Sequence, residues 1–149
     1  KIFEKKSKKK SKSNHQPYHM YLSARDMSKI GLLMLNEGKY NNKQVVPEEW
    51  IKKITSLVTP LKEINPKEKR FEKALWGYGY MWWVWDGYGE KDIMQGAFKA
   101  HGGNNTIVVI PKLNIVIVTK PGSKDSDKPP LSEPDFTRLV VREVLLSQS

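Results

Sequence analysis

The sequence predicts an α+β domain in which helices cover an antiparallel sheet. Two β-branched runs, within residues 104–110 and 115–120, are separated only by a short turn that begins with a proline, which is typical of a buried hairpin. Helical patterns stand both before and after this hairpin, and such helices normally cover one face of an antiparallel sheet. A chain of 149 residues fits one domain that can bury a sizeable core.

Three helices are expected, over residues 23–36, 47–55 and 134–147. Ser23 is a candidate N-cap with Asp26 three residues later, which is a capping-box pattern. The apolar stripe of this first helix is expected to consist of Met27, Ile30 and Met34, with Leu33 as a further candidate. The second helix opens with Pro47 and two acidic residues, which suit the positive end of a helix dipole.

The sheet is expected to contain four strands, over residues 76–85, 97–101, 104–110 and 115–120. In the first of them aromatic rings alternate with smaller residues, so that one face should carry Trp76, Tyr78, Tyr80 and Trp82. Gly77 and Gly79 fall on the opposite face of this strand. Glycines in that position predict that another element crosses closely on their side.

The net charge of +10 is concentrated at the start of the chain, where residues 1–12 hold seven lysines and one glutamate. We expect residues 1–16 to be a lysine-rich flexible segment and residues 17–149 to form the folded domain. No aromatic residue interleaves with the lysines after Phe3, and no recognition-helix pattern follows. We therefore expect no specific nucleic-acid partner.

Several classes of site are not expected. The absence of cysteine excludes disulfides, thiolate catalysis and zinc sites built on cysteine. His15 and His19 have the spacing of a metal pair on a helix, but Pro17 interrupts that helix and no third ligand is near. We expect no metal, no cofactor and no transmembrane segment. Because the chain opens on Lys1, the lack of a targeting segment excludes no compartment.

His101-Gly102-Gly103 stands at the end of a strand, just before the most buried hairpin. Glycines at a strand end allow a backbone to approach a ligand closely. They can equally form a tight bend in which they only relieve crowding. The local residues leave both interpretations open.

Four segments in order resemble the β-lactamase-related serine hydrolases, the superfamily of class C β-lactamases, DD-peptidases and related esterases. The matching segments are residues 21–50, 76–83, 101–103 and 110–118. Together they extend over roughly residues 18–120. In that family a serine of a Ser-x-x-Lys motif attacks the acyl carbon, the lysine is the base, and a tyrosine of a Tyr-x-Asn motif assists proton transfer.

The family's first two motifs precede the segments that match here. The resemblance therefore implies that residues 17–149 are the C-terminal part of such a domain, without its nucleophile and inactive alone. Ser7 and Lys10 fit Ser-x-x-Lys in letters, but no apolar helix surrounds them to desolvate the lysine. Tyr40-Asn41-Asn42 fits Tyr-x-Asn, but it occupies the family's helix-ending turn.

By the resemblance, His101 belongs to the third motif of the family, on the strand that forms one wall of the site. The backbone N–H of Asn104, or that of Gly103, would donate to the oxyanion, and Gly102, Gly103 and Asn105 would contact substrate. Gly102 lacks the hydroxyl of the Lys-Thr-Gly form, which argues against turnover of β-lactams. The resemblance implies a small-molecule or peptide acyl substrate: an ester, an amide or a β-lactam.

The partners implied are that acyl substrate and the missing N-terminal part of the domain, in a periplasmic or other extracytoplasmic location. The residues alone leave the compartment unknown. A different function is a non-catalytic binding module that uses the aromatic strand and the basic segment. Exposure of the aromatic rings would favour the module, and burial would count against it.

Overall fold

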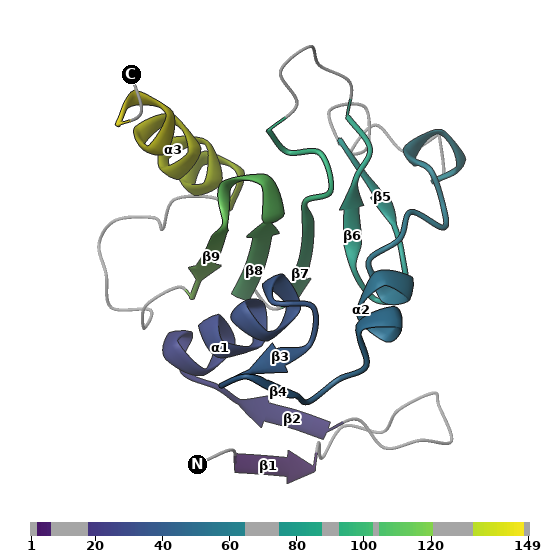
Figure 1. The fold of residues 1–149 in the computed structure, drawn as a ribbon, viewed down its shortest axis with the longest axis vertical. Helices are drawn as coiled ribbons and strands as arrows, with labels where there is room; N and C mark the ends of the chain where they lie inside the picture. Colours follow the sequence, from purple (N-terminus) through teal and green to yellow (C-terminus); the bar gives the residue numbers. More distant parts are fainter. Residues whose placement is uncertain are drawn as a thin grey trace.

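A computed structural model of the chain describes residues 3–6, 18–64, 75–87, 93–102, 105–120 and 133–147. It confirms the expected α+β class: helices pack on an antiparallel sheet of five strands (Figure 1). The strands follow one another in the sheet in the order β5 (Trp76–Tyr78), β6 (Trp83–Trp85), β7 (Phe98–Gly102), β8 (Asn105–Ile110) and β9 (Ile115–Thr119).

The core lies on both faces of β8, because alternate residues of a strand point to opposite sides. Val109 belongs to the cluster under helix α1 (Ala24–Leu35). Val108 and Ile110 belong to the cluster that includes Phe136 and Val140 of helix α3 (Glu133–Leu146). The three β8 residues have no exposed surface. The sheet is therefore a middle layer between α1 and α3.

Helix α1 begins as expected. The Ser23 Oγ accepts a hydrogen bond from the Asp26 N–H at 3.1 Å, and the Asp26 carboxylate accepts one from the Ser23 N–H at 3.1 Å. The buried stripe of the helix differs from the expected one in one position: Gly31 is buried, whereas Ile30 is 37% exposed. A Cβ on Gly31 would lie 2.3 Å from Val116 Cγ1, so the helix approaches the sheet at this glycine.

The remaining elements are short. Helix α2 (Glu48–Ile54) falls within the expected residues 47–55, and α3 lies one residue before the expected 134–147. Two hairpins stand apart from the main sheet, β1 (Phe3–Lys6) with β2 (Tyr18–Tyr21) and β3 (Lys39–Tyr40) with β4 (Lys43–Gln44). Strand β1 falls in the segment for which the sequence predicted no regular structure; residues 7–17 lie outside the described part. The described residues also include the 3-10 turns η1 (Leu61–Glu63) and η3 (Pro111–Leu113).

The aromatic stretch 76–85 is two strands rather than the single strand expected. β5 and β6 pair antiparallel, and the turn between them contains Met81 at a φ of 67°. Trp76 packs into the cluster with α3, whereas Trp82 packs into the cluster with α1. The prediction that these rings share one face is therefore wrong, because a hairpin turn separates them.

The element that crosses behind Gly77 and Gly79 is the chain that follows α2. A Cβ on Gly77 would lie 2.7 Å from the Thr59 carbonyl oxygen, and one on Gly79 would lie 2.6 Å from the Ser56 carbonyl oxygen. This confirms the close crossing that the glycines predicted. Their lack of a side chain lets α2 and the β5–β6 hairpin pack backbone to backbone.

Strand β9 ends the sheet on the side away from β5. It pairs with β8 over its whole length, and no described residue pairs with its other edge. Every residue of β9 is buried or half-buried. Among the described helices, none combines the length and the apolar character that crossing a bilayer requires.

Candidate functional site at the open end of strand β7

Strand β7 runs past the start of β6. In the ladder, β6 pairs with β7 at two positions, Trp83 with Lys99 and Val84 with Phe98, whereas β8 follows β7 as far as Gly102. Residues 100–102 therefore have a backbone edge that no described strand occupies. Unpaired N–H and C=O groups on such an edge can hydrogen-bond an extended ligand.

The β5–β6 turn explains why this edge is open. The Tyr80 N–H donates to the Ile54 carbonyl at the end of α2 at 3.1 Å, and the Gly79 N–H donates to the Trp82 carbonyl at 2.7 Å. These bonds hold the turn against α2. The left-handed Met81 completes the turn, so the chain joins β7 only from Trp83 onward.

His101 lies on the open segment. Its side chain is on the sheet face that α3 covers, but the described contacts of α3 on β7 are at the other end, around Ala97. His101 is exposed and stacks on Trp83, with ring centroids 5.8 Å apart and planes at 22°. Directly opposite on β8 is Thr106, which is 4% exposed. The site therefore presents an imidazole at the end of a rigid, buried ladder.

Gly102 is exposed, and a Cβ there would meet no described atom within 4 Å. Its φ is not in the left-handed region. Among the described residues, neither crowding nor backbone conformation therefore demands glycine at this position. None of these residues fills the space beside Gly102.

The other expected site residues are only partly described. Asn105 is half-buried and pairs with Gly102 across the ladder. Gly103 and Asn104 lie outside the described residues, so their expected contacts with substrate and oxyanion stay predictions.

Three of the four described serines are engaged locally. Ser23 caps α1, Ser28 Oγ donates to the Arg25 carbonyl at 2.8 Å, and Ser56 Oγ donates to the Lys53 carbonyl at 2.8 Å. The fourth, Ser147, follows the end of α3, so none of the four lies on the sheet. Ser7 and Lys10 lie outside the described part. Within that part there is also no group of three acidic, histidine or cysteine residues that could hold a metal ion.

The sequence reasoning missed Trp83, and with it Lys99. Lys99 is 9% exposed, with its Nζ 4.5 Å from the centre of the Trp76 ring on the face that carries His101. Both residues become visible only through the register of β6 on β7. The glycine before the turn, Gly79, was the one local signal that the aromatic run would break.

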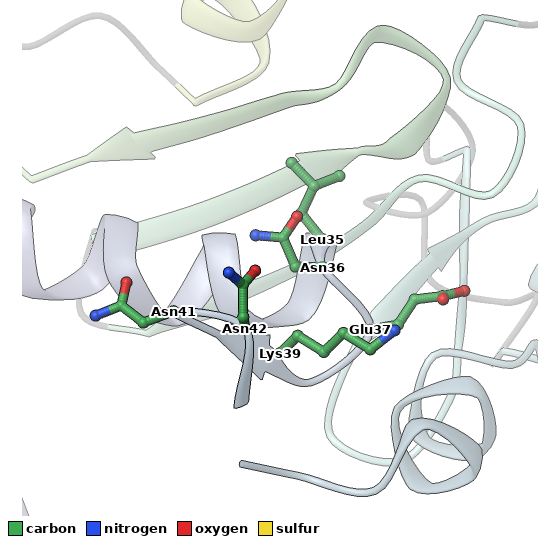
Figure 2. A pocket seen from close by; sticks show the side chains of 6 residues that line it. All are labelled: Leu35, Asn36, Glu37, Lys39, Asn41 and Asn42. Carbon is green, nitrogen blue, oxygen red and sulfur yellow. The ribbon is translucent and has the colours of Figure 1, made fainter. Parts of the chain in front are cut away.

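A separate hollow of about 530 Å³ lies where α1 ends and the β3–β4 hairpin begins (Figure 2). It is lined by Leu35, Asn36, Glu37, Lys39, Asn41 and Asn42. Asn41 and Asn42 have φ values of 48° and 61°, the left-handed values of a tight hairpin turn. The literal Tyr-x-Asn match is therefore a turn, as expected, and the lining contains neither serine nor histidine.

The groups with shifted pKa values lie on helices α1 and α2, close to their ends. Hydrogen bonds from Ser23 lower the pKa of the Asp26 carboxyl, and a hydrogen bond and the charge of Lys52 lower that of Glu48. Reciprocally, Glu48 raises the pKa of Lys52. These are exposed groups that stabilise helix termini, and they do not form part of the β7 site.

No family model matches the chain. An uncharacterized protein of Alkalihalophilus pseudofirmus is 32% identical over 109 residues, an alignment that covers 67% of this chain and 29% of that protein. A solved structure described as "Putative 6-aminohexanoate-dimer hydrolase from Bacillus anthracis" matches with a TM-score of 0.56 and 24% identity, over 88% of this chain and 30% of that one.

The chain thus spans about 30% of the length of each of these two proteins. At this level of identity the second comparison concerns the fold. The chain is folded like part of that hydrolase.

Proposed function

We propose that this chain is the C-terminal part of a β-lactamase-like serine hydrolase, in which the open end of β7 forms one wall of an acyl-transfer site. The observation that carries the proposal is the edge of residues 100–102 that no described strand pairs, with His101 beside it. The likeness of the fold to part of a hydrolase supports the reaction class.

The chemistry divides between this chain and the rest of the domain. A serine hydroxyl needs an adjacent base to become a nucleophile, and we assign both groups to a region outside these 149 residues. The β7 edge supplies backbone groups that align an extended substrate. The N–H of Asn104, or of Gly103, stabilises the oxyanion of the tetrahedral intermediate.

His101 contributes an imidazole next to the reacting carbonyl. An imidazole can donate a hydrogen bond to a substrate carboxylate or exchange a proton with the nucleophile. Gly102, Gly103 and Asn105 leave space for, and contact, the acyl chain. Because Gly102 carries no hydroxyl, esters and amides fit the site better than β-lactams do.

The non-catalytic alternative depends on whether the rings of the aromatic stretch are exposed. Tyr80 is 48% exposed, whereas the rings of Trp76, Tyr78 and Trp82 are half-buried. Trp76 and Trp82 also lie in opposite clusters, so the rings do not form one exposed face, which favours the hydrolase over the binding module.

The experiment uses the release of p-nitrophenol from p-nitrophenyl acetate. The 149-residue chain should show no burst. When the chain is expressed together with the encoded sequence upstream of Lys1, a burst should appear. His101→Asn should then lower kcat/KM by about 10²- to 10⁴-fold, the usual range for a proton-transfer group. Ser28→Ala, which removes a serine on α1, should leave kcat/KM unchanged.

Two results would overturn the division of chemistry. A burst from the chain alone that survives Ser7→Ala would require another nucleophile within these residues. A burst that Ser7→Ala abolishes would make the lysine-rich segment catalytic.

A further inference from the structure

Trp83 is the residue of β6 that borders the open edge, and it is in contact with His101. We infer that Trp83 is a positioning residue, which holds the His101 imidazole parallel to its indole ring at the open end of β7. The role of a positioned His101 in catalysis rests on the proposed function. The contact between the two rings can be tested without that function.

The two rings are diagonal neighbours on one face of the sheet. Trp83 pairs directly with Lys99, and His101 lies two residues further along β7. Diagonal neighbours are within reach of large rings. The centroid distance of 5.8 Å and the interplanar angle of 22° describe an offset stack, a favoured arrangement of aromatic pairs.

Trp83 is itself held in place from the other side. Tyr78 lies directly opposite it on β5 and packs edge to face, with centroids 4.9 Å apart and planes at 73°. The backbone of Tyr78 exchanges two hydrogen bonds with Thr59, each of 2.8 Å. A continuous series of contacts therefore runs from Thr59 through Tyr78 and Trp83 to His101.

His101 depends on this support. Within the described part of the chain, the imidazole packs on the Trp83 ring and is otherwise exposed. An unrestrained exposed side chain samples several rotamers. Stacking confines the imidazole to one plane before substrate arrives, and a reacting group that is already oriented loses less entropy in the reaction.

The chain offers a matched control in Trp85. It is on the same strand and the same face as Trp83, and it packs on Trp76 with centroids 5.2 Å apart and planes at 83°. No described contact joins it to His101. Loss of Trp85 removes a similar aromatic contact and leaves the stack intact.

The experiment is an NMR measurement of the histidine ring protons in the 149-residue chain, with His101 assigned through His101→Asn. In the unsubstituted chain the indole ring current should shift the His101 ring protons upfield, with cross-relaxation between the two rings. Trp83→Leu should remove this shift, Trp83→Phe should retain part of it, and Trp85→Leu should leave it unchanged. Carbethoxylation of His101 by diethyl pyrocarbonate should become several-fold faster in Trp83→Leu only.

Circular dichroism of each variant establishes that it is folded. If Trp83→Leu does not fold, the cross-relaxation in the unsubstituted chain and the partial shift in Trp83→Phe decide. The inference is overturned if His101 shows no cross-relaxation with Trp83, or if Trp83→Leu and Trp85→Leu change its resonances equally. These measurements do not depend on hydrolysis, so their failure can be distinguished from a failure of the proposed activity.

Discussion

The two ends of strand β7 have opposite surroundings. At the first end Ala97 and Phe98 are buried, with α3 and α1 on the two faces and β6 and β8 on the two edges. At the second end His101 and Gly102 are exposed, and β8 alone continues beside them. One strand of five residues therefore passes from core to surface.

This difference shows how a small sheet can present a fixed group without a loop. The first end is packed on every side and is therefore fixed in the core. The second end continues the same strand, so its position is fixed as well. Exposure at the second end then costs little stability, since few apolar contacts depend on it. Changes at the first end should act on folding, and changes at the second on the site.

The largest effect is expected from Phe98→Ala at the packed end. Phe98 is 4% exposed and meets the Trp82 ring edge to face at 5.3 Å. Removing a buried phenylalanine side chain typically costs about 3–5 kcal/mol. Urea unfolding of the chain measures this loss. His101→Ala should lower the free energy of unfolding by less than about 1 kcal/mol, the contribution of one aromatic pair. Equal losses in the two variants would contradict the difference between the two ends of β7.

Two glycine substitutions sharpen the comparison. Gly77→Ala would place a Cβ 2.3 Å from Leu57 Cδ1 and 2.7 Å from the Thr59 oxygen, and overpacking of this kind costs about 1–3 kcal/mol. Gly102→Ala meets open space and should change stability by no more than about 0.5 kcal/mol. The measurement is the shift in the urea midpoint of each variant. A destabilising Gly102→Ala would mean that the open end is packed after all.

Met81→Gly should stabilise the chain slightly. Met81 is 79% exposed, so its side chain contributes little packing, and its φ of 67° is unfavourable for a residue with a Cβ. The relief of this strain outweighs the added entropy of glycine in the unfolded chain, for a gain of about 0.5 kcal/mol. Thermal unfolding detects it. Tyr80→Gly, at a position without a positive φ, should instead lower the melting temperature.

The smallest effect concerns the cap of α1, which supports the packed end. The hydrogen bonds from Ser23 lower the pKa of Asp26, so the ionised carboxylate is favoured in the folded state. Its contribution is present above the unfolded pKa and is lost as the pH falls through the folded value. The difference in urea midpoint between the unsubstituted chain and Ser23→Ala should therefore shrink as the pH falls below the unfolded pKa of an aspartate, about 3.9. A difference that stays constant would contradict the assignment.

The elements that the sequence predicted well are those with local signals. The Ser23 and Asp26 pattern marked the start of α1, and the β-branched runs marked β8 and β9. The glycines at 77 and 79 correctly predicted a close crossing. In each case a few neighbouring residues carry the physical reason.

The features that escaped prediction depend on distant contacts. The aromatic alternation continues through residues 79–82, so it resembles one strand although Met81 turns the chain. That turn is held by the carbonyl of Ile54, far away in the sequence. The stack of Trp83 on His101 requires the register of two strands, which no local pattern specifies. At the site, His101 and Gly102 could be singled out from sequence, but the open edge beside them could not.

The outer edge of β9, which no described strand pairs, has a consequence for how the chain behaves in solution. Its sequence, with four β-branched apolar residues followed by Thr119, is that of a strand from the middle of a sheet, without the lysine or proline that commonly protects an edge. Such an edge is a template for pairing between molecules. The net charge of +10 opposes this association through mutual repulsion, and salt weakens that repulsion. The chain should therefore lose solubility as the ionic strength rises.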